Sequence, residues 1–220
     1  MDIELVRLLQ LVSPSLPVGA FAYSQGLESA VEAQLVSNEE AAKEWIGGIL
    51  NNNISHLDLP ALKYQMQYLA EQDELAIERL NDRLIAFRET KELRAESLQM
   101  AKALRRLLLD LNIDLTLLPE GELDWVTAFA FAATSQSIEI DNAMLGFAWS
   151  WCENQIAAAI KLVPLGQTQG QRLLHQIGST LTEQVAKAKL INADNIGAIA
   201  PHLAILSSQH ENQYSRLFRS

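Results

Sequence analysis

The sequence predicts an all-α protein, and three observations support that prediction. Ala, Leu, Glu, Gln and Arg are abundant, whereas alternating runs of β-branched residues are scarce. Apolar residues recur at spacings of three and four. Residues 61–118 contain neither proline nor glycine, so nothing there forces a helix to end. No linker-like stretch or solenoid repeat divides the chain, and we expect a single all-helical domain over residues 1–220, a bundle of about nine or ten helices.

Start signals place the helices of the first half of the chain. Asp58 precedes Leu59-Pro60, and proline suits the first turn of a helix. Thr90 is expected to cap the next long helix. The buried stripe of that helix is predicted from residues that step by three and four, namely Leu93, Ser97, Met100, Leu104, Leu107 and Leu111.

The second half of the chain contains similar start and stop signals for helices. Pro119-Glu120-Gly121 predicts a turn, and Asp124 lies near a new helix start. The next stripe consists of Ile140, Met144, Phe147 and Trp151. Pro164-Leu165-Gly166 ends that helix, residues 167–189 resume helical character, and Pro201 opens the last segment.

Composition and charge exclude several classes of protein. The chain has 220 residues, 49% of them hydrophobic, which is typical of a folded globular protein. The net charge of -10 argues against binding to nucleic-acid backbones. The acids gather in residues 1–60 and 119–160. Residues 161–220, with six Lys or Arg and three Asp or Glu, carry the only net positive charge.

The N-terminus and the apolar stretches point to the cytoplasm. Asp2 and Glu4 stand where a secretory signal needs positive charge. The apolar stretches are about ten residues long, too short to span a bilayer. Cys152 is the one cysteine, which excludes an internal disulfide and any multi-cysteine metal cluster.

An enzymatic reading would rest on Cys152 as nucleophile, with His175, His202 or His210 as its base. The apolar run Trp-Ser-Trp-Cys instead favours a small core residue. The histidines, which include His56, form no HxxxH or HExxH pattern, and the chain has no Walker A, GxGxxG or GxSxG motif. We therefore expect no catalytic, cofactor or metal site within the chain.

Three segments are unusual enough to be candidate contact surfaces. Residues 13–28 combine two prolines and two glycines with aromatic and polar side chains, so they are either a loop packed on the core or a preformed contact surface. Residues 149–170 place Glu153, Asn154 and Gln155 inside an apolar helix, which suggests an interface or an ordinary helix junction. The C-terminal stretch HENQYSRLFRS, residues 210–220, ends in aromatic and arginine residues, a composition typical of binding hot spots. Its residues 211–220 are called the C-terminal segment. It is expected to dock on the body of the protein or on a partner.

These segments resemble the UreF family of urease accessory proteins. The similarity lies in LLQLVSPSLPVGAFAYSQGLE, RETKELRAESLQMAKAL, WSWCENQIAAAIKLVPLGQTQGQRLL and APHLAILSSQHENQYSRLFRS, which follow one another in family order. One departure is Ala20 in the first of these stretches.

The resemblance implies an all-α adaptor without catalytic activity or an intrinsic cofactor. Such proteins form a complex with the accessory protein UreD (UreH in some species) and recruit the GTPase UreG to the urease apoprotein for nickel insertion. Nickel and GTP are handled by the complex, with GTP on UreG, and some members form a homodimer. The alternatives are a direct nickel carrier that uses His56, His202 or His210, and a helical enzyme that uses Cys152.

The resemblance also suggests which residues contact partners. Those expected to face the GTPase are Glu153, Gln155, Lys161, Pro164 and Gln167, with Tyr23, Gln25 and Glu28 on the same surface. The C-terminal segment, with Tyr214, Arg216 and Arg219, is expected to become ordered, or to order its neighbours, when the UreD-type partner binds.

Overall fold

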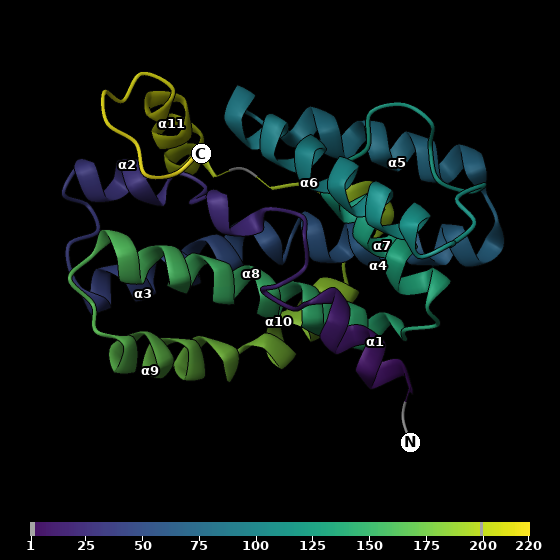
Figure 1. Ribbon diagram of the computed structural model, residues 1–220, viewed down its shortest axis with the longest axis horizontal. Coiled ribbons are helices and arrows are strands. Elements are labelled where there is room, and N and C mark those ends of the chain that lie inside the picture. Colours follow the sequence, from purple (N-terminus) through teal and green to yellow (C-terminus); the bar gives the residue numbers. More distant parts are fainter. Residues whose placement is uncertain (1–2, 199) are drawn as a thin grey trace.

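Every regular element of the described chain is a helix. The computed structural model describes residues 3–198 and 200–220, so Asp2 lies outside the described residues. Within these ranges the α-helices are α1 to α11, as labelled in Figure 1, and three short 3-10 or π segments join them. The all-α prediction is confirmed. The extent of the expected single domain, residues 1–220, stays a prediction.

The first half of the chain supplies six helices. They are α1 (Ile3–Leu11), α2 (Leu27–Glu32), α3 (Glu39–Ile49), α4 (Asp58–Glu71), α5 (Glu74–Phe87) and α6 (Lys91–Asp110). A 3-10 turn, Ala20–Ala22, precedes α2, and a π-helical turn, Leu50–Ile54, follows α3.

The second half supplies five helices. They are α7 (Trp125–Ser135), α8 (Ile140–Leu162), α9 (Gln167–Gly178), α10 (Leu181–Lys189) and α11 (Pro201–His210), with a 3-10 turn at Ala193–Asn195. None of the helices in the described ranges is both long enough and apolar enough to cross a bilayer.

Two of the expected start signals, Thr90 and Asp124, act as caps. The Thr90 hydroxyl accepts a hydrogen bond from the Leu93 amide at 3.2 Å, and an Asp124 carboxylate oxygen accepts one from the Val126 amide at 2.9 Å. α4 begins at Asp58, and α11 begins at Pro201. Each cap supplies an acceptor for an amide that the first helical turn leaves free.

The predicted stripe of α6 is confirmed in its middle and wrong at its end. Ser97, Met100 and Leu104 are buried, but Leu111 is 46% exposed. α6 ends at Asp110, so Leu111 no longer follows the helical period, and Leu108 takes the buried position instead.

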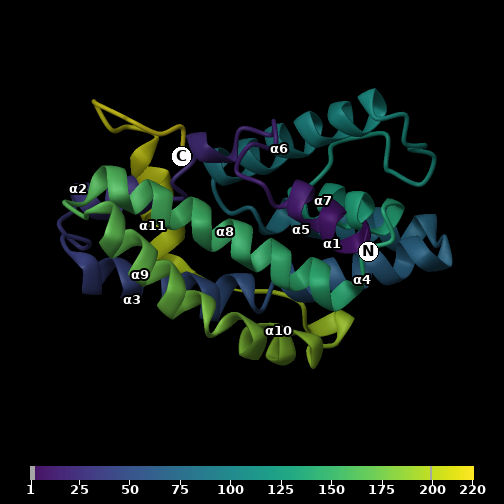
Figure 2. The same ribbon diagram turned by 60° about the horizontal axis from the view of Figure 1, so that its bottom comes forward.

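The buried apolar residues form one continuous core between two groups of helices. α3, α8 and α9 pack against one another on one side, while α4, α5, α6 and α7 pack together on the other (Figures 1 and 2). At the junction, the rings of Phe129 and Phe147 meet edge to face with centroids 5.1 Å apart. The described chain begins with α1 at the lower edge of the view and finishes beside α2 and α11 (Figure 1).

A buried charge cluster fixes the starts of α4 and α7. Arg88 donates hydrogen bonds to both carboxylate oxygens of Asp124, at 2.8 and 3.0 Å, and to Asp58 at 2.8 Å. Burial alone would raise the pKa of Asp124, but the Arg88 guanidinium and its hydrogen bonds lower it below its ordinary value. The cluster ties the end of α5 to two helix N-termini.

Candidate partner-binding surface

The three segments singled out from the sequence meet in the structure. The Asn154 side-chain amide donates to the Tyr23 carbonyl at 3.3 Å, and the Trp151 indole N–H donates to the Gln25 side chain at 2.7 Å. The Lys161 ammonium lies 5.4 Å from the centroid of the Phe218 ring, within cation–π range. The loop 13–28, the middle of α8 and the C-terminal segment thus form one joined surface.

Backbone geometry brings α2 into place beneath this surface. Gly26 has a φ of +77°, a conformation that favours glycine, and a Cβ there would lie 3.2 Å from the Leu203 side chain of α11. The turn therefore needs a residue without a side chain. Because α2 begins directly after this turn, Glu28 stands in its first helical turn.

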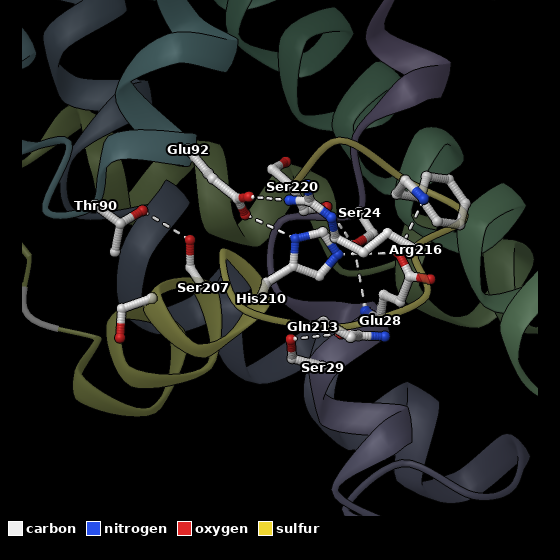
Figure 3. A network of polar contacts seen from close by, with 12 residues as sticks. Ser24, Glu28, Ser29, Thr90, Glu92, Ser207, His210, Gln213, Arg216 and Ser220 are labelled. Atoms are coloured by element: carbon white, nitrogen blue, oxygen red, sulfur yellow. Dashed lines mark hydrogen bonds and ion pairs between the residues drawn. The ribbon is translucent and has the colours of Figure 1, made fainter.

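Glu28 is the residue that holds the C-terminal segment. Its side chain is buried, and its two carboxylate oxygens accept hydrogen bonds from the amides of Leu217, at 2.6 Å, and Phe218, at 2.9 Å (Figure 3). A carboxylate in the first turn of a helix is also favoured by the helix dipole. Two backbone donors and one charged acceptor make this a strong contact.

His210 links Glu28 to α6. The imidazole is fully buried, with Nε2 3.0 Å from a Glu28 oxygen and Nδ1 2.8 Å from a Glu92 oxygen. Arg216 donates to the other oxygen of Glu92 at 2.9 Å (Figure 3). Four parts of the chain, α2, α6, α11 and the C-terminal segment, meet at this ring.

The last residues extend the contact to the loop before α2. The amide and the hydroxyl of Ser24 both donate to the Ser220 backbone oxygen, at 2.7 and 2.5 Å, and the Arg219 amide donates to the Ala22 carbonyl at 2.8 Å. The Phe218 ring is buried. Of the two docking sites left open by the sequence, the structure shows docking on the body of the protein itself.

Glu96 on α6 is a further carboxylate that contacts the C-terminal segment. Its oxygens accept hydrogen bonds from the Gln25 amide at 2.7 Å and from the Ser220 hydroxyl at 2.9 Å. Burial raises the pKa of Glu96 to about 7. Nearby, the buried Tyr23 hydroxyl donates to Gln99 at 2.7 Å, and burial raises the pKa of Tyr23 as well.

A cavity of about 200 Å³ lies beside the network. Its lining includes Gln25, Trp151 and four acids, Asp58, Glu89, Glu96 and Glu153. Two of these acids have partners, since Asp58 pairs with Arg88 and Glu96 accepts from Gln25. In the described part of the chain, no group of three or more His, Cys, Asp or Glu side chains is arranged to hold a metal ion.

The residues predicted to contact partners differ in exposure. Those that face solvent are Lys161, Pro164, Gln167, Tyr214, Arg216 and Arg219, while Gln25 and Glu153 are half-buried. Tyr23, Glu28 and Gln155 are buried, so they lie beneath the surface in this conformation. The partner-binding role of all these residues stays a prediction.

Glu92 and Glu96 are central to the network, yet the sequence patterns single out neither as part of a contact surface. Glu28 and His210 are 182 positions apart in the chain, so no local spacing could have indicated their contact. The sequence offered one usable signal, the presence of acidic residues and a histidine on segments with otherwise apolar faces.

Cys152, the candidate nucleophile, and the three remaining histidines differ in burial. Cys152 is fully buried, and burial raises the pKa of its thiol to about 12. A thiol of that kind stays protonated and is a weak nucleophile at neutral pH. His56, His175 and His202 are exposed.

Comparison with known proteins decides the family. The UreF family model matches residues 36–178. The chain belongs to the UreF family. It is 48% identical over 219 residues to the "Urease accessory protein UreF" of Marinomonas sp. (strain MWYL1), covering 100% of this chain and 95% of that protein. The proteins of the same name from Marinobacter nauticus and Chromohalobacter salexigens are 44% and 43% identical, covering 100% and 99% of this chain and 95% of each relative.

The family model and the alignment with the Marinomonas relative cover different parts of the joined surface. The UreF family model includes α8 with Lys161 but ends before α11, and it begins after Glu28. The alignment with the Marinomonas relative spans the whole chain and so includes both the loop 13–28 and the C-terminal segment.

The raised pKa of Glu96 predicts a pH-dependent stability. Its value of about 7 in the fold exceeds the ordinary 4.5, so the native state binds the proton more tightly. This contribution is complete below pH 4.5 and is lost as the pH rises through about 7. We expect it to lower the free energy of unfolding by about 2–3 kcal/mol between about pH 5 and pH 8.

The Glu96→Gln variant tests this. Glutamine keeps the shape and can still bond Gln25 and Ser220, but it does not ionise. Urea unfolding across that pH range should show a clearly smaller loss of stability in the variant than in the wild type. Equal slopes of the free energy of unfolding against pH in the two proteins would show that Glu96 does not contribute to the pH dependence of stability.

Proposed function

We propose that this UreF-family protein is a non-catalytic adaptor in urease maturation. With a UreD-type (UreH-type) accessory protein, it recruits the GTPase UreG to the urease apoprotein and couples GTP hydrolysis to nickel incorporation. It acts in the cytoplasm, binds no cofactor of its own, and leaves nickel and GTP to the complex. The name of its relatives, urease accessory protein, supports the general role.

The observation that supports an adaptor best is the joined surface. It combines three segments that are far apart in the chain, and hydrogen bonds hold each of them in place. A surface that is already ordered loses little conformational entropy when a partner binds. Its exposed side chains include aromatic and arginine residues, which dominate binding energy at protein interfaces.

The charge of the surface suggests the character of one partner face. Lys161, Arg216 and Arg219 are exposed close to the C-terminal segment, in a chain whose net charge is -10. Such a positive area on an acidic protein orients a partner that carries a complementary acidic face. We assign Lys161 to the GTPase interface and the C-terminal segment, with Arg216 and Arg219, to the interface with the UreD-type protein.

The Lys161→Glu variant tests the assignment of the GTPase. Lys161 is exposed, so reversing its charge should leave the fold intact and weaken UreG capture by at least about tenfold, since like charges across an interface repel. Co-purification of UreG with the variant complex, assembled with the UreD-type protein, measures this.

The matched control is Lys102→Glu on α6, another exposed lysine that lies outside the joined surface. It should retain wild-type capture of UreG. Normal capture by Lys161→Glu would remove this lysine from the interface, and equal loss in both variants would indicate a general charge effect.

Tyr214→Ala tests the assignment of the C-terminal segment. The Tyr214 side chain is fully exposed, so its removal should change the free energy of unfolding by less than about 0.5 kcal/mol. If Tyr214 anchors the UreD-type protein, the Kd should rise by at least about tenfold, as for other aromatic hot spots. Calorimetric titration gives the Kd, and an unchanged value places Tyr214 outside the interface.

A further inference from the structure

We propose that the C-terminal segment, residues 211–220, is a pH-operated latch. It is docked while His210 carries a hydrogen on both ring nitrogens, and it is released when the ring loses one of them. The inference goes beyond the adaptor role and does not depend on it, because it rests on contacts within this chain.

The argument begins with what faces the imidazole. Its two ring nitrogens contact carboxylate oxygens of Glu28 on α2 and Glu92 on α6, at 3.0 and 2.8 Å. An ionised carboxylate accepts hydrogen bonds and has none to donate. Both contacts are therefore hydrogen bonds only when the ring is the charged imidazolium. The third charged group here is Arg216 of the C-terminal segment, which pairs with Glu92.

Loss of one proton from the ring changes the contact that holds the segment. A lone pair on one ring nitrogen would then face a carboxylate oxygen of Glu28 or Glu92 with no hydrogen between them, at a fully buried ring. Two acceptors in contact where water is excluded are strongly unfavourable. Release of Leu217 and Phe218, whose amides bond to Glu28, would let water reach that carboxylate.

A second ionisable group, Glu96, contacts the other end of the segment. The Ser220 hydroxyl bonds to it, and its buried carboxyl has a pKa of about 7. The charged groups that influence it are Arg88, which favours the ionised form, and Asp58, which opposes it. Burial raises the pKa of this carboxyl, whereas the Ser220 hydrogen bond lowers it, so Glu96 gives docking no clear pH direction and the latch rests on His210.

The shape of the segment allows it to move without disturbing the core. Residues 211, 212, 214 and 215, between α11 and the docked end, are exposed, and Gln213 is held by Ser29 at 3.3 Å. Phe218 is the buried apolar side chain of the docked end. Opening would uncover Glu28, Glu96 and Ser24, which lie beneath residues 217–220.

Hydrogen exchange of the full-length protein, followed by mass spectrometry, tests the latch. The exchange rate of peptides covering residues 211–220 is divided by that of an unstructured peptide of the same sequence at each pH. We expect the protection of these amides to fall at least about tenfold between about pH 6 and pH 8.5, as the ring loses one of its two hydrogens. Equal protection across that range would overturn the proposal.

Three variants assign the effect to His210. His210→Gln carries no positive charge, and its two N–H donors sit on one nitrogen instead of at the two ring positions, so at pH 6 it should show the weak protection of the wild type at pH 8.5. Glu92→Gln can donate to a neutral ring while Nε2 still donates to Glu28, so it should keep the segment protected at high pH. The exposed His202 lies on the same helix, and His202→Gln should behave as the wild type.

Two results would contradict the assignment. One is wild-type protection of His210→Gln at pH 6. The other is opening of Glu92→Gln at pH 8.5 to the same extent as the wild type. The test does not depend on His210→Gln alone. If that variant folds poorly, the protection that Glu92→Gln is expected to gain at high pH still tests the proposal.

Discussion

The structure depends on one buried carboxylate, that of Glu28. It accepts two backbone amides of the C-terminal segment and faces the buried imidazole of His210. A charge can be buried only where hydrogen bonds and an opposite charge offset its lost hydration. Glu28 meets that condition only when α2, α11 and the C-terminal segment are all in place, so these elements order one another.

A second buried charge cluster also holds separate helices together. Arg88 joins Asp58 and Asp124 and so fixes the N-termini of α4 and α7. Glu96 lies on α6 between the two clusters, and its pKa is influenced by Arg88 while its oxygen bonds Ser220. The joined surface is thus supported by charges buried beneath it as well as by apolar packing. Residues 161–220 carry a net positive charge, and Lys161, Arg216 and Arg219 place part of it at the exposed edge of the joined surface.

Much of the fold could be predicted because its signals are local. Thr90, Asp124 and Pro201 mark helix starts through contacts within one turn, and the apolar periods of α6 and α8 follow from helical geometry. The network around His210 could not be predicted, because Glu28, Glu92 and His210 come from three separate helices. The sequence therefore indicated which segments are unusual, whereas only the fold shows that the loop 13–28, α8 and the C-terminal segment meet.

The most direct test of this account is a double-mutant cycle on the free energy of unfolding. It combines Glu28→Gln with deletion of residues 216–220. If Glu28 acts by holding the C-terminal segment, the substitution should cost about 3 kcal/mol in the full chain and less than about 1 kcal/mol in the shortened chain, where Glu28 meets solvent. An equal cost in both backgrounds would show that Glu28 stabilises the protein without the C-terminal segment and would contradict the account.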